Sequence, residues 1–189
     1  MKCENALIAL GSNLPGEAGN SLNVCITTID ACESHAVRVV ARSRWRRSPA
    51  FPAGSGPDFV NGAFMVETTL SARALLSHLH EVEARMGRVR KVRWGPRVCD
   101  LDLIAYGNSI APDRATVSAL MGEGATTAAA PDHMVLPHPR MHERAFVLAP
   151  LADIAPEWCH PVTGLSVSEM LAALPAATRA EVEVIAEDK

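Results

Sequence analysis

The stretch Val98-Cys99-Asp100-Leu101-Asp102-Leu103-Ile104-Ala105-Tyr106 is predicted to be the strand on which the fold and the chemistry depend. Side chains alternate along a strand, so Asp100 and Asp102 point to one face while Leu101 and Leu103 point to the other. Two carboxylates about 7 Å apart on one face can converge on a hard cation. The alternative interpretation is a solvent-facing pair of acids at the end of a strand.

Upstream of this strand, hydrophobic periodicity predicts three more strands and two helices. They are the strands 6–10, 37–47 and 59–69, a helix that begins at Asn20 or Ser21, and a helix that Ser71 caps and Gly87 ends. In the strand 37–47, Trp45 is expected on one face and the arginines on the other. The order β-α-β-β-α-β is that of the ferredoxin-like split βαβ motif, so we expect an α+β fold with an antiparallel sheet flanked by helices.

The remainder of the chain is expected to decorate this core. Residues 109–132 are rich in Ala, Thr and Gly without a clear period, which predicts a mobile surface insertion. Residues 142–154 suggest a short helix that is interrupted at Pro150, and Ser166 opens a capping box before an extra C-terminal helix. Residues 181–186 could form one more strand at the sheet edge. We expect residues 1–189 to form a single domain.

Composition excludes several classes of protein. Apolar residues make up 48% and charged residues 21% of 189 residues, which argues against general disorder and against a fibrous repeat. No apolar run is long enough to span a bilayer, and residues 1–5 lack a signal-peptide core. Five cysteines without a C-x-x-C spacing disfavour a disulfide scaffold and a zinc site. We therefore expect a cytoplasmic protein that binds no membrane.

Basic residues gather in two short segments although the net charge is −3. Residues 42–47 contain four arginines, and residues 85–97 contain six basic groups and no acid. The plain interpretation of both segments is a solvated surface. However, the rest of the chain is acidic, and the concentration of basic residues in two short segments favours a site for an anionic ligand. Because the second segment leads directly into the strand with Asp100 and Asp102, the pattern fits a complex of magnesium with a triphosphate. Trp94 in that segment fits a planar ligand, a lid contact or ordinary packing.

A Pro-flanked loop, residues 136–144, contains further candidate phosphate ligands. His138, Arg140 and Arg144 could contact phosphate groups. His138 and His142 also permit a zinc interpretation, which is weak because no H-E-x-x-H pattern is present and Pro139 disfavours a helix.

Several motifs in one order make this chain resemble the 6-hydroxymethyl-7,8-dihydropterin pyrophosphokinase family of folate biosynthesis. The resemblance rests on these segments: Ala9-Leu10-Gly11-Ser12-Asn13-Leu14, Pro57-Asp58-Phe59-Val60-Asn61-Gly62-Ala63, Arg93-Trp94-Gly95-Pro96-Arg97-Val98-Cys99-Asp100-Leu101-Asp102-Leu103, Leu136-Pro137-His138-Pro139 and Glu143-Arg144-Ala145-Phe146-Val147-Leu148. Family members transfer the β,γ-pyrophosphoryl group of ATP to the pterin hydroxymethyl oxygen and release AMP.

The resemblance implies a role for each matching residue. Asp100 and Asp102 would bind two magnesium ions, and Arg88 and Arg97 would act with them in catalysis. The residues implied for ATP binding are Arg88, Arg90, Trp94, Arg97, Leu103, His138 and Arg144. The residues implied for pterin binding are Ser48, Pro49, Phe51, Phe59, Asn61, Trp94 and Phe146. Glu83 is also expected near the site. Phe59 stands where Tyr is common in the family, so a ring is kept and a hydroxyl is lost.

The same features leave two other functions open. A ferredoxin-like nucleic-acid-binding module would use the arginine clusters, but two carboxylates beside them would repel a phosphate backbone, and no RNA-recognition aromatic signature appears. A magnesium-dependent phosphohydrolase is the third interpretation. For the preferred function we expect a monomer whose partners are ATP and 6-hydroxymethyl-7,8-dihydropterin, with no nucleic acid.

Overall fold

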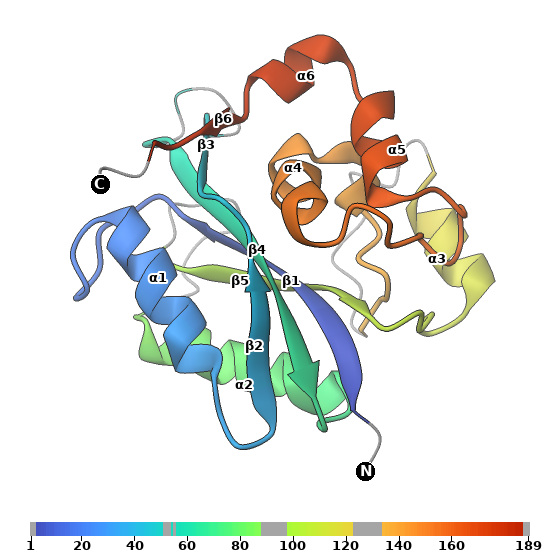
Figure 1. Cartoon of the computed structure of the whole chain (residues 1–189), viewed down its shortest axis with the longest axis horizontal. Helices are drawn as coiled ribbons and strands as arrows, with labels where there is room; N and C mark the ends of the chain where they lie inside the picture. Colours follow the sequence, from blue (N-terminus) through green and yellow to red (C-terminus); the bar gives the residue numbers. More distant parts are fainter. Residues whose placement is uncertain (1–2, 51–53, 55, 88–97, 123–133, 187–189) are drawn as a thin grey trace.

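The computed structural model describes residues 3–50, 54, 56–87, 98–122 and 134–186, and its centre is a twisted antiparallel sheet (Figure 1). The strands of this sheet lie in the order β5-β1-β4-β3-β6, and β2 also pairs with β4. Their bounds are β1 Glu4–Ser12, β2 Val37–Arg42, β3 Arg46–Ser48, β4 Phe59–Thr68, β5 Asp100–Tyr106 and β6 Glu183–Val184. The predicted α+β, ferredoxin-like class is confirmed, because β1 lies between β4 and β5 and is antiparallel to both.

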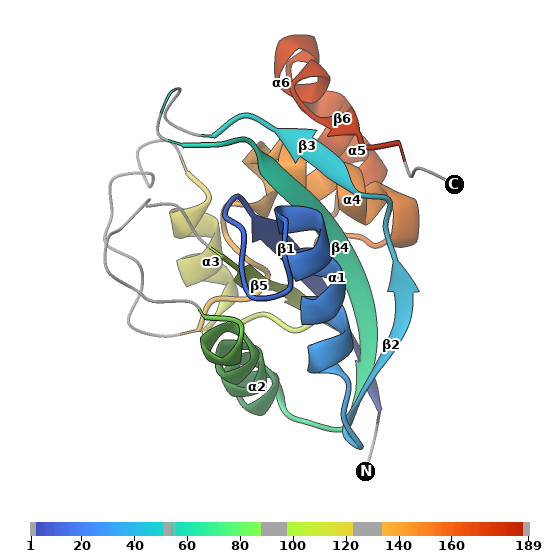
Figure 2. The ribbon, with the colours of Figure 1, turned by 90° about the vertical axis from the view of Figure 1, so that its left-hand side faces the viewer.

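Helices cover both faces of the sheet (Figure 2). On one face, α1 (Ser21–Cys32) and α2 (Ala72–Arg85) bury their apolar stripes against the even-numbered residues of β1. On the other face, α4 (Ala145–Ile154) and α5 (Val167–Ala173) pack against Leu7 and Ala9 of the same strand. β1 is therefore apolar on both sides, which explains its near-continuous hydrophobic run.

The predicted helix boundaries follow from their caps. The Asn20 side chain accepts a hydrogen bond from Asn23 N, and the Ser71 side chain accepts one from Ala74 N. In both helices, one backbone N–H of the first turn therefore has a hydrogen-bond partner. Gly87, with φ +86°, follows α2 in a conformation that favours glycine.

The prediction of one continuous strand over residues 37–47 is wrong, because this segment forms two strands, β2 and β3. The register shifts between Val39 and Ala41, and the chain then bends so that Trp45 enters the core on the face that α1 and α2 cover. Gly62 makes this possible, since a Cβ on it would lie 2.5 Å from the Trp45 ring. Arg46 points to the opposite face, as predicted, but that face is covered by α4 and is not open to solvent.

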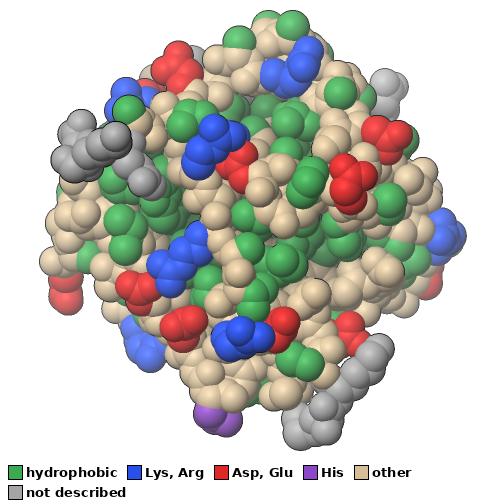
Figure 3. All heavy atoms as spheres, viewed as in Figure 1, with side chains coloured by type: hydrophobic (Ala, Val, Ile, Leu, Met, Phe, Trp, Pro, Cys, Tyr) green, Lys and Arg blue, Asp and Glu red, His purple; other side chains and the backbone are tan. Residues whose placement is uncertain are grey.

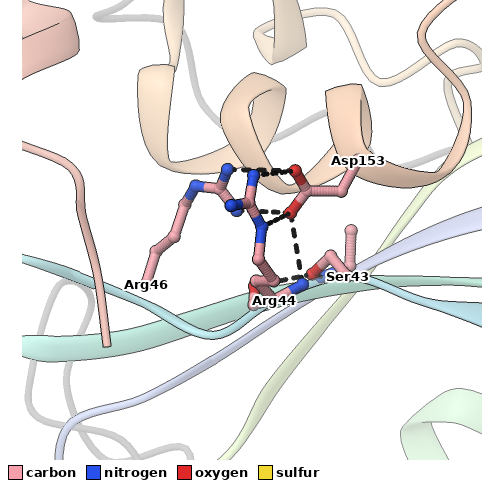
Figure 4. A network of polar contacts seen from close by, with 5 residues as sticks. Ser43, Arg44, Arg46 and Asp153 are labelled. Carbon is pink, nitrogen blue, oxygen red and sulfur yellow. Dashed lines mark hydrogen bonds and ion pairs between the residues drawn. The ribbon is translucent and has the colours of Figure 1, made fainter. Parts of the chain in front are cut away.

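Arg44 and Arg46 close around one carboxylate of α4 (Figure 4). Arg46 Nη1 lies 2.6 Å from Asp153 Oδ2, and Arg46 Nη2 lies 3.1 Å from Oδ1. Arg44 Nη2 donates to Oδ1 at 2.8 Å, and the Arg44 amide donates to Oδ2 at 3.2 Å. These hydrogen bonds lower the pKa of Asp153 to about 2 against the opposing effect of burial. The network ties α4 to the segment that leads into β3.

The predicted insertion contains a helix that its composition did not reveal. α3 (Arg114–Leu120) is capped by Asp113, whose side chain accepts from Thr116 N, and it buries Val117 completely. Arg114 donates to the carbonyl oxygens of Pro161 and Val162, at 2.6 and 3.0 Å. The predicted surface insertion therefore contains an ordered helical turn at residues 114–120, most of whose side chains are exposed or half-buried. Residues 123–133 lie outside the described part.

The C-terminal third differs from the prediction in two places. A 3₁₀ turn, η2 (Met141–Glu143), precedes α4, and α4 continues through Pro150 although an interruption was expected there. Pro150 lies in the second turn of α4, where proline removes one helix hydrogen bond. α6 (Ala176–Ala180) was not predicted, whereas the Ser166 capping box and the edge strand β6 are confirmed. In the described residues, no helix is long and apolar enough to cross a membrane.

Candidate active site

Two carboxylates project from the start of β5, as the alternation of the strand predicts. Leu101 and Leu103 are buried in the core beside α1 and α2, while Asp100 and Asp102 are only partly buried on the opposite side of the strand. The side chain of Asp102 is 39% exposed, and its Oδ2 lies 3.9 Å from Arg144 Nη1. The pair is therefore accessible from solvent and lies beside a guanidinium group.

Glu83 holds the strand that carries these acids. It is 1% exposed at the inner face of α2, and its Oε1 accepts a hydrogen bond from the Leu101 amide at 2.7 Å. Leu101 lies between the two aspartates in sequence, so this bond fixes the backbone from which both project. Glu83 was expected near the site, and the structure places it behind the strand.

Gly11 connects the aspartates with a second group of predicted residues. It pairs with Asp100 of β5 on one side and with Asn61 of β4 on the other. Directly paired residues of antiparallel strands point to the same side of the sheet, so these three positions form one row. Two strand spacings separate its ends by about 10 Å. Because the middle residue has no side chain, the sheet between the carboxylate and the amide is an open floor.

Asn61, at one end of this row, is held in a fixed orientation. It is 4% exposed, and its Nδ2 donates to Ser48 Oγ at 2.9 Å and to the Phe59 carbonyl at 3.4 Å. Its Oδ1 then faces the open floor, 3.5 Å from the place that a Cβ on Gly11 would take. Phe59 borders the same floor, with its ring 3.6 Å from that place. An oxygen acceptor beside an aromatic ring suits a flat ligand with ring N–H groups.

His138 lies on the other side of the aspartates. Its amide donates to the Ile104 carbonyl at 2.8 Å, and its Nδ1 accepts from the Arg140 amide at 3.1 Å. The ring proton therefore resides on Nε2. Burial is the main cause that lowers the pKa of His138, which favours the neutral ring. His138 can thus donate a hydrogen bond to an anion without carrying a charge.

Arg144 and Phe146 begin α4 beside this histidine. The Arg144 guanidinium lies 5.7 Å from the centre of the Phe146 ring, and its side chain is 17% exposed. Burial lowers the pKa of Arg144, an effect that neighbouring Asp102 opposes. Phe146 is 40% exposed, which is unusual for a large apolar ring and leaves one face open to a ligand.

A cavity of about 190 Å³ lies between α2, β5 and the segment before His138. Apolar side chains line most of it, together with His80, Asp102 and His138. Leu103, which the resemblance implies for ATP binding, is one of the apolar lining residues. A larger cavity of about 650 Å³ lies at the opposite end of the sheet and contains none of the predicted site residues. We place the candidate site beside the smaller cavity, because Asp102 and His138 line it and Arg144 lies beside Asp102.

The part of the chain that the structure describes contains no group of three or more His, Cys, Asp or Glu side chains that could hold a metal ion. The zinc interpretation of His138 and His142 therefore gains no support. Magnesium commonly takes only one or two protein carboxylates and completes its shell with water and phosphate oxygens. Asp100 and Asp102, side by side and open to solvent, fit that requirement.

Five predicted residues, in the loop 88–97 and at position 51, lie outside the described residues: Phe51, Arg88, Arg90, Trp94 and Arg97. Pro49 is exposed beside Ser48 at the end of β3. In the first basic cluster, residues 42–47, three of the four arginines form ion pairs within the molecule. Arg42 pairs with Asp30 at 2.8 Å, and Arg44 and Arg46 pair with Asp153, so these guanidinium groups are engaged within the molecule.

Comparison with known proteins agrees with this geometry. A family model described as 7,8-dihydro-6-hydroxymethylpterin-pyrophosphokinase matches residues 7–156. The 2-amino-4-hydroxy-6-hydroxymethyldihydropteridine pyrophosphokinase of Methylorubrum extorquens is 37% identical over 89% of this chain and 92% of its own length. The protein of the same name from Synechocystis is 35% identical over 90% of this chain and 76% of its own length.

A solved structure shows the same fold. The Plasmodium falciparum HPPK-DHPS chain, crystallised with pterin and p-hydroxybenzoate, superposes with a TM-score of 0.65 at 12% identity. The match covers 90% of this chain and 43% of that one. The matched motifs, the row of residues across the sheet and the curated relatives agree, and the chain belongs to the 7,8-dihydro-6-hydroxymethylpterin-pyrophosphokinase family.

Proposed function

We propose that this chain transfers the β,γ-pyrophosphoryl group of ATP to the hydroxymethyl oxygen of 6-hydroxymethyl-7,8-dihydropterin and releases AMP. One observation carries the proposal: Asn61, Gly11 and Asp100 lie in a row across three paired strands. The row joins a site for a flat hydrogen-bonding ring to a pair of carboxylates, at a separation of about 10 Å that a small bicyclic ring can span.

The pterin end of the row provides recognition. Asn61 Oδ1 can accept from a ring N–H, and its amide nitrogen is already used by Ser48 and Phe59. Phe59 and Phe146 supply aromatic surfaces for the two faces of the ring. We assign the pterin contacts to these residues together with Pro49, Phe51 and Trp94. The absence of a hydroxyl on Phe59 leaves stacking as its contribution.

The other end neutralises and aligns the triphosphate. Asp100 and Asp102 would hold two magnesium ions, which supply charge neutralisation for the phosphates and lower the pKa of a coordinated hydroxyl. His138 offers a neutral N–H donor, and Arg144 offers a guanidinium fork, so each can orient a phosphate oxygen. We assign Arg88, Arg90 and Arg97 to the same task, and the apolar cavity beside Leu103 to the nucleoside.

The reaction itself requires alignment more than acid–base chemistry. The hydroxymethyl oxygen attacks the β-phosphorus in line and gives up its proton to solvent, the bond from that phosphorus to the α,β-bridging oxygen breaks, and AMP leaves with the bridging oxygen. Residues that fix both substrates lower the entropy cost of this approach. No described side chain needs to act as a dedicated base in this scheme.

One incubation distinguishes the proposal from its alternatives. Full-length protein with ATP, Mg²⁺ and 6-hydroxymethyl-7,8-dihydropterin should yield AMP and the pterin diphosphate in equal amounts by mass spectrometry. ADP as co-product, or phosphate release without pterin, would replace the assignment with a kinase or a phosphohydrolase. Salt-sensitive RNA binding without turnover would favour the nucleic-acid module. On the face in Figure 3, basic side chains lie next to acidic ones. This mixture of charges does not favour binding of a nucleic-acid backbone on that face.

We also propose that the whole chain acts as one domain, as a monomer, and in the cytoplasm. The buried cysteines Cys25, Cys32 and Cys99 are not joined in disulfide bonds, which is compatible with a reducing compartment. Light scattering after size exclusion should give a mass near the 20.2 kDa of one chain. A mass of about twice that value would contradict the monomer.

A further inference from the structure

His160 is a fully buried histidine with a defined proton position. Its exposed fraction is 0%, and its Nδ1 accepts hydrogen bonds from the amides of Val162 and Thr163, at 3.2 and 3.3 Å. A neutral imidazole that accepts at Nδ1 carries its proton on Nε2. Burial lowers the pKa of His160 to about 4, so the ring is neutral at physiological pH. His160 therefore presents a buried Nε2–H donor.

That donor has a complementary partner nearby. Among the described residues, two buried side-chain nitrogens lack a hydrogen-bond partner, His160 Nε2 and His142 Nδ1. A charge on His142 would lower the pKa of His160 further, which places the two rings in the same neighbourhood. The two nitrogens form no hydrogen bond with each other in the structure. Since a buried polar group without a partner is costly, a water molecule between them or a small shift of the rings would satisfy both.

We propose that His160 is a positioning residue whose Nε2–H donates a hydrogen bond to His142 Nδ1, directly or through one water molecule. In this arrangement the proton of the His142 ring lies on Nε2. A metal bridge is excluded by the same geometry, since a ligating Nε2 would move the proton of His160 to Nδ1, where two amides already donate.

The contact would hold the turn that presents the nucleotide-side residues. His142 is the middle residue of η2, between His138 and Arg144 in sequence. Met141, in the same turn, donates its amide to the His138 carbonyl, and the Arg144 amide donates to the Met141 carbonyl. A tether at His142 therefore restrains the backbone on both sides, toward His138 and toward Arg144.

The other end of the tether is itself rigid. His160 begins a tight turn in which its amide donates to the Leu165 carbonyl and the Gly164 amide donates back, both at 2.8 Å. Trp158 packs edge-on against the His160 ring, and Arg114 of α3 binds the next two carbonyls. A rigid turn can hold the segment that carries His138 and Arg144 in place. A partner on a solvent-exposed side chain would move too freely to do so.

Nuclear magnetic resonance on the ¹⁵N-histidine-labelled protein tests the bond without reference to catalysis. We expect the Nε2–H tautomer for both rings and a slowly exchanging Hε2 proton on His160. Scalar coupling between the two nitrogens would identify the direct bond, and a contact of Hε2 with water would identify the bridged form. A proton on His160 Nδ1, or one on His142 Nδ1, would overturn the proposal.

Nucleotide affinity tests the positioning role, which rests on the proposed function. The probe is α,β-methylene ATP with Mg²⁺, because the proposed reaction breaks the α–β linkage and the probe cannot react. His142→Leu should weaken its binding about tenfold, or about 1.4 kcal/mol. His142→Asn, which places an oxygen acceptor near the position of Nδ1, should restore most of the affinity. His35→Leu, at an exposed site, is the control.

The two variants separate positioning from general stability. Equal affinities of His142→Leu and His142→Asn would refute the positioning role, even if both variants unfold at a lower temperature. The binding measurement needs no pterin and no turnover. A failure of the proposed reaction would therefore appear in the product assay, while a failure of this inference would appear in the tautomers or in the affinities.

Discussion

Replacing Asp153 by Asn should destabilise the protein by about 1–2 kcal/mol at pH 7. Asp153 receives a two-pronged ion pair from Arg46, whose side chain is 8% exposed. The pKa of Asp153 falls from its ordinary 3.8 to about 2, and a difference of that size is worth at most about 2.4 kcal/mol. Asp153 as a whole residue is exposed, although its side chain is only 16% exposed. We therefore lower the expected loss of stability from about 2.4 to about 1–2 kcal/mol, because solvent screens the ion pair.

The contribution has a defined pH dependence. Because the folded-state pKa is lower than the unfolded one, the stabilisation is complete above about pH 4 and is lost as the pH falls toward 2. Roughly half of it should be gone at pH 3. Urea unfolding followed by the fluorescence of buried Trp45 measures the free energy of unfolding at both pH values.

Two results would refute this reasoning. One is a difference below about 0.5 kcal/mol between wild type and Asp153→Asn at pH 7, the size of an ordinary surface change. The other is a difference that stays the same at pH 7 and pH 3. Glu81→Gln, at an exposed position on α2, is the matched control and should change neither value.

Three further predictions concern the site itself. Asp100→Asn should reduce turnover by at least about 100-fold in a steady-state assay, because the charge of the carboxylate is needed to bind the metal. The temperature of thermal unfolding should stay within a few degrees of wild type, because the side chain is only partly buried. Near-normal turnover would remove Asp100 from the metal site. Gly11→Val should raise KM for the pterin about tenfold or more with little effect on nucleotide affinity, since it fills the floor beside Asn61 Oδ1; an unchanged KM would place the pterin elsewhere. Glu83→Leu should lower the free energy of unfolding in urea by about 1–3 kcal/mol and should also lower kcat, because the Leu101 amide loses its buried acceptor. A loss of stability with an unchanged kcat would show that Glu83 does not position the aspartates.

The local signals in the chain were sufficient for the core. The helical stripes after Asn20 and Ser71, the capping residues and the alternation at Asp100 and Asp102 are properties of neighbouring residues, and the structure confirms them. The Ser166 capping box is equally local, and both of its hydrogen bonds are present. Such patterns can be read because the periods of helices and strands act over a few residues.

Errors arose where a distant segment decides the local structure. The alternation of residues 37–47 continues through Ser43 and Arg44, and only the approach of Trp45 to Gly62 and of Asp153 to Arg46 shows why the strand breaks. α3 has little periodicity of its own, and it is held by Val117 in the core and by Arg114 on a turn about 47 residues away. Tertiary packing overrides weak local preference in both cases.

The candidate site divides in the same way. The kinds of residue that bind phosphate, metal and an aromatic ring were apparent from the motifs, because their chemistry belongs to each side chain. Their arrangement was not, because strand pairing sets it: β1 lies between β4 and β5, and this places glycine between Asn61 and Asp100. The orientation of Asn61 and the proton positions of His138 and His160 depend on hydrogen bonds with backbone groups that only the folded chain brings into reach.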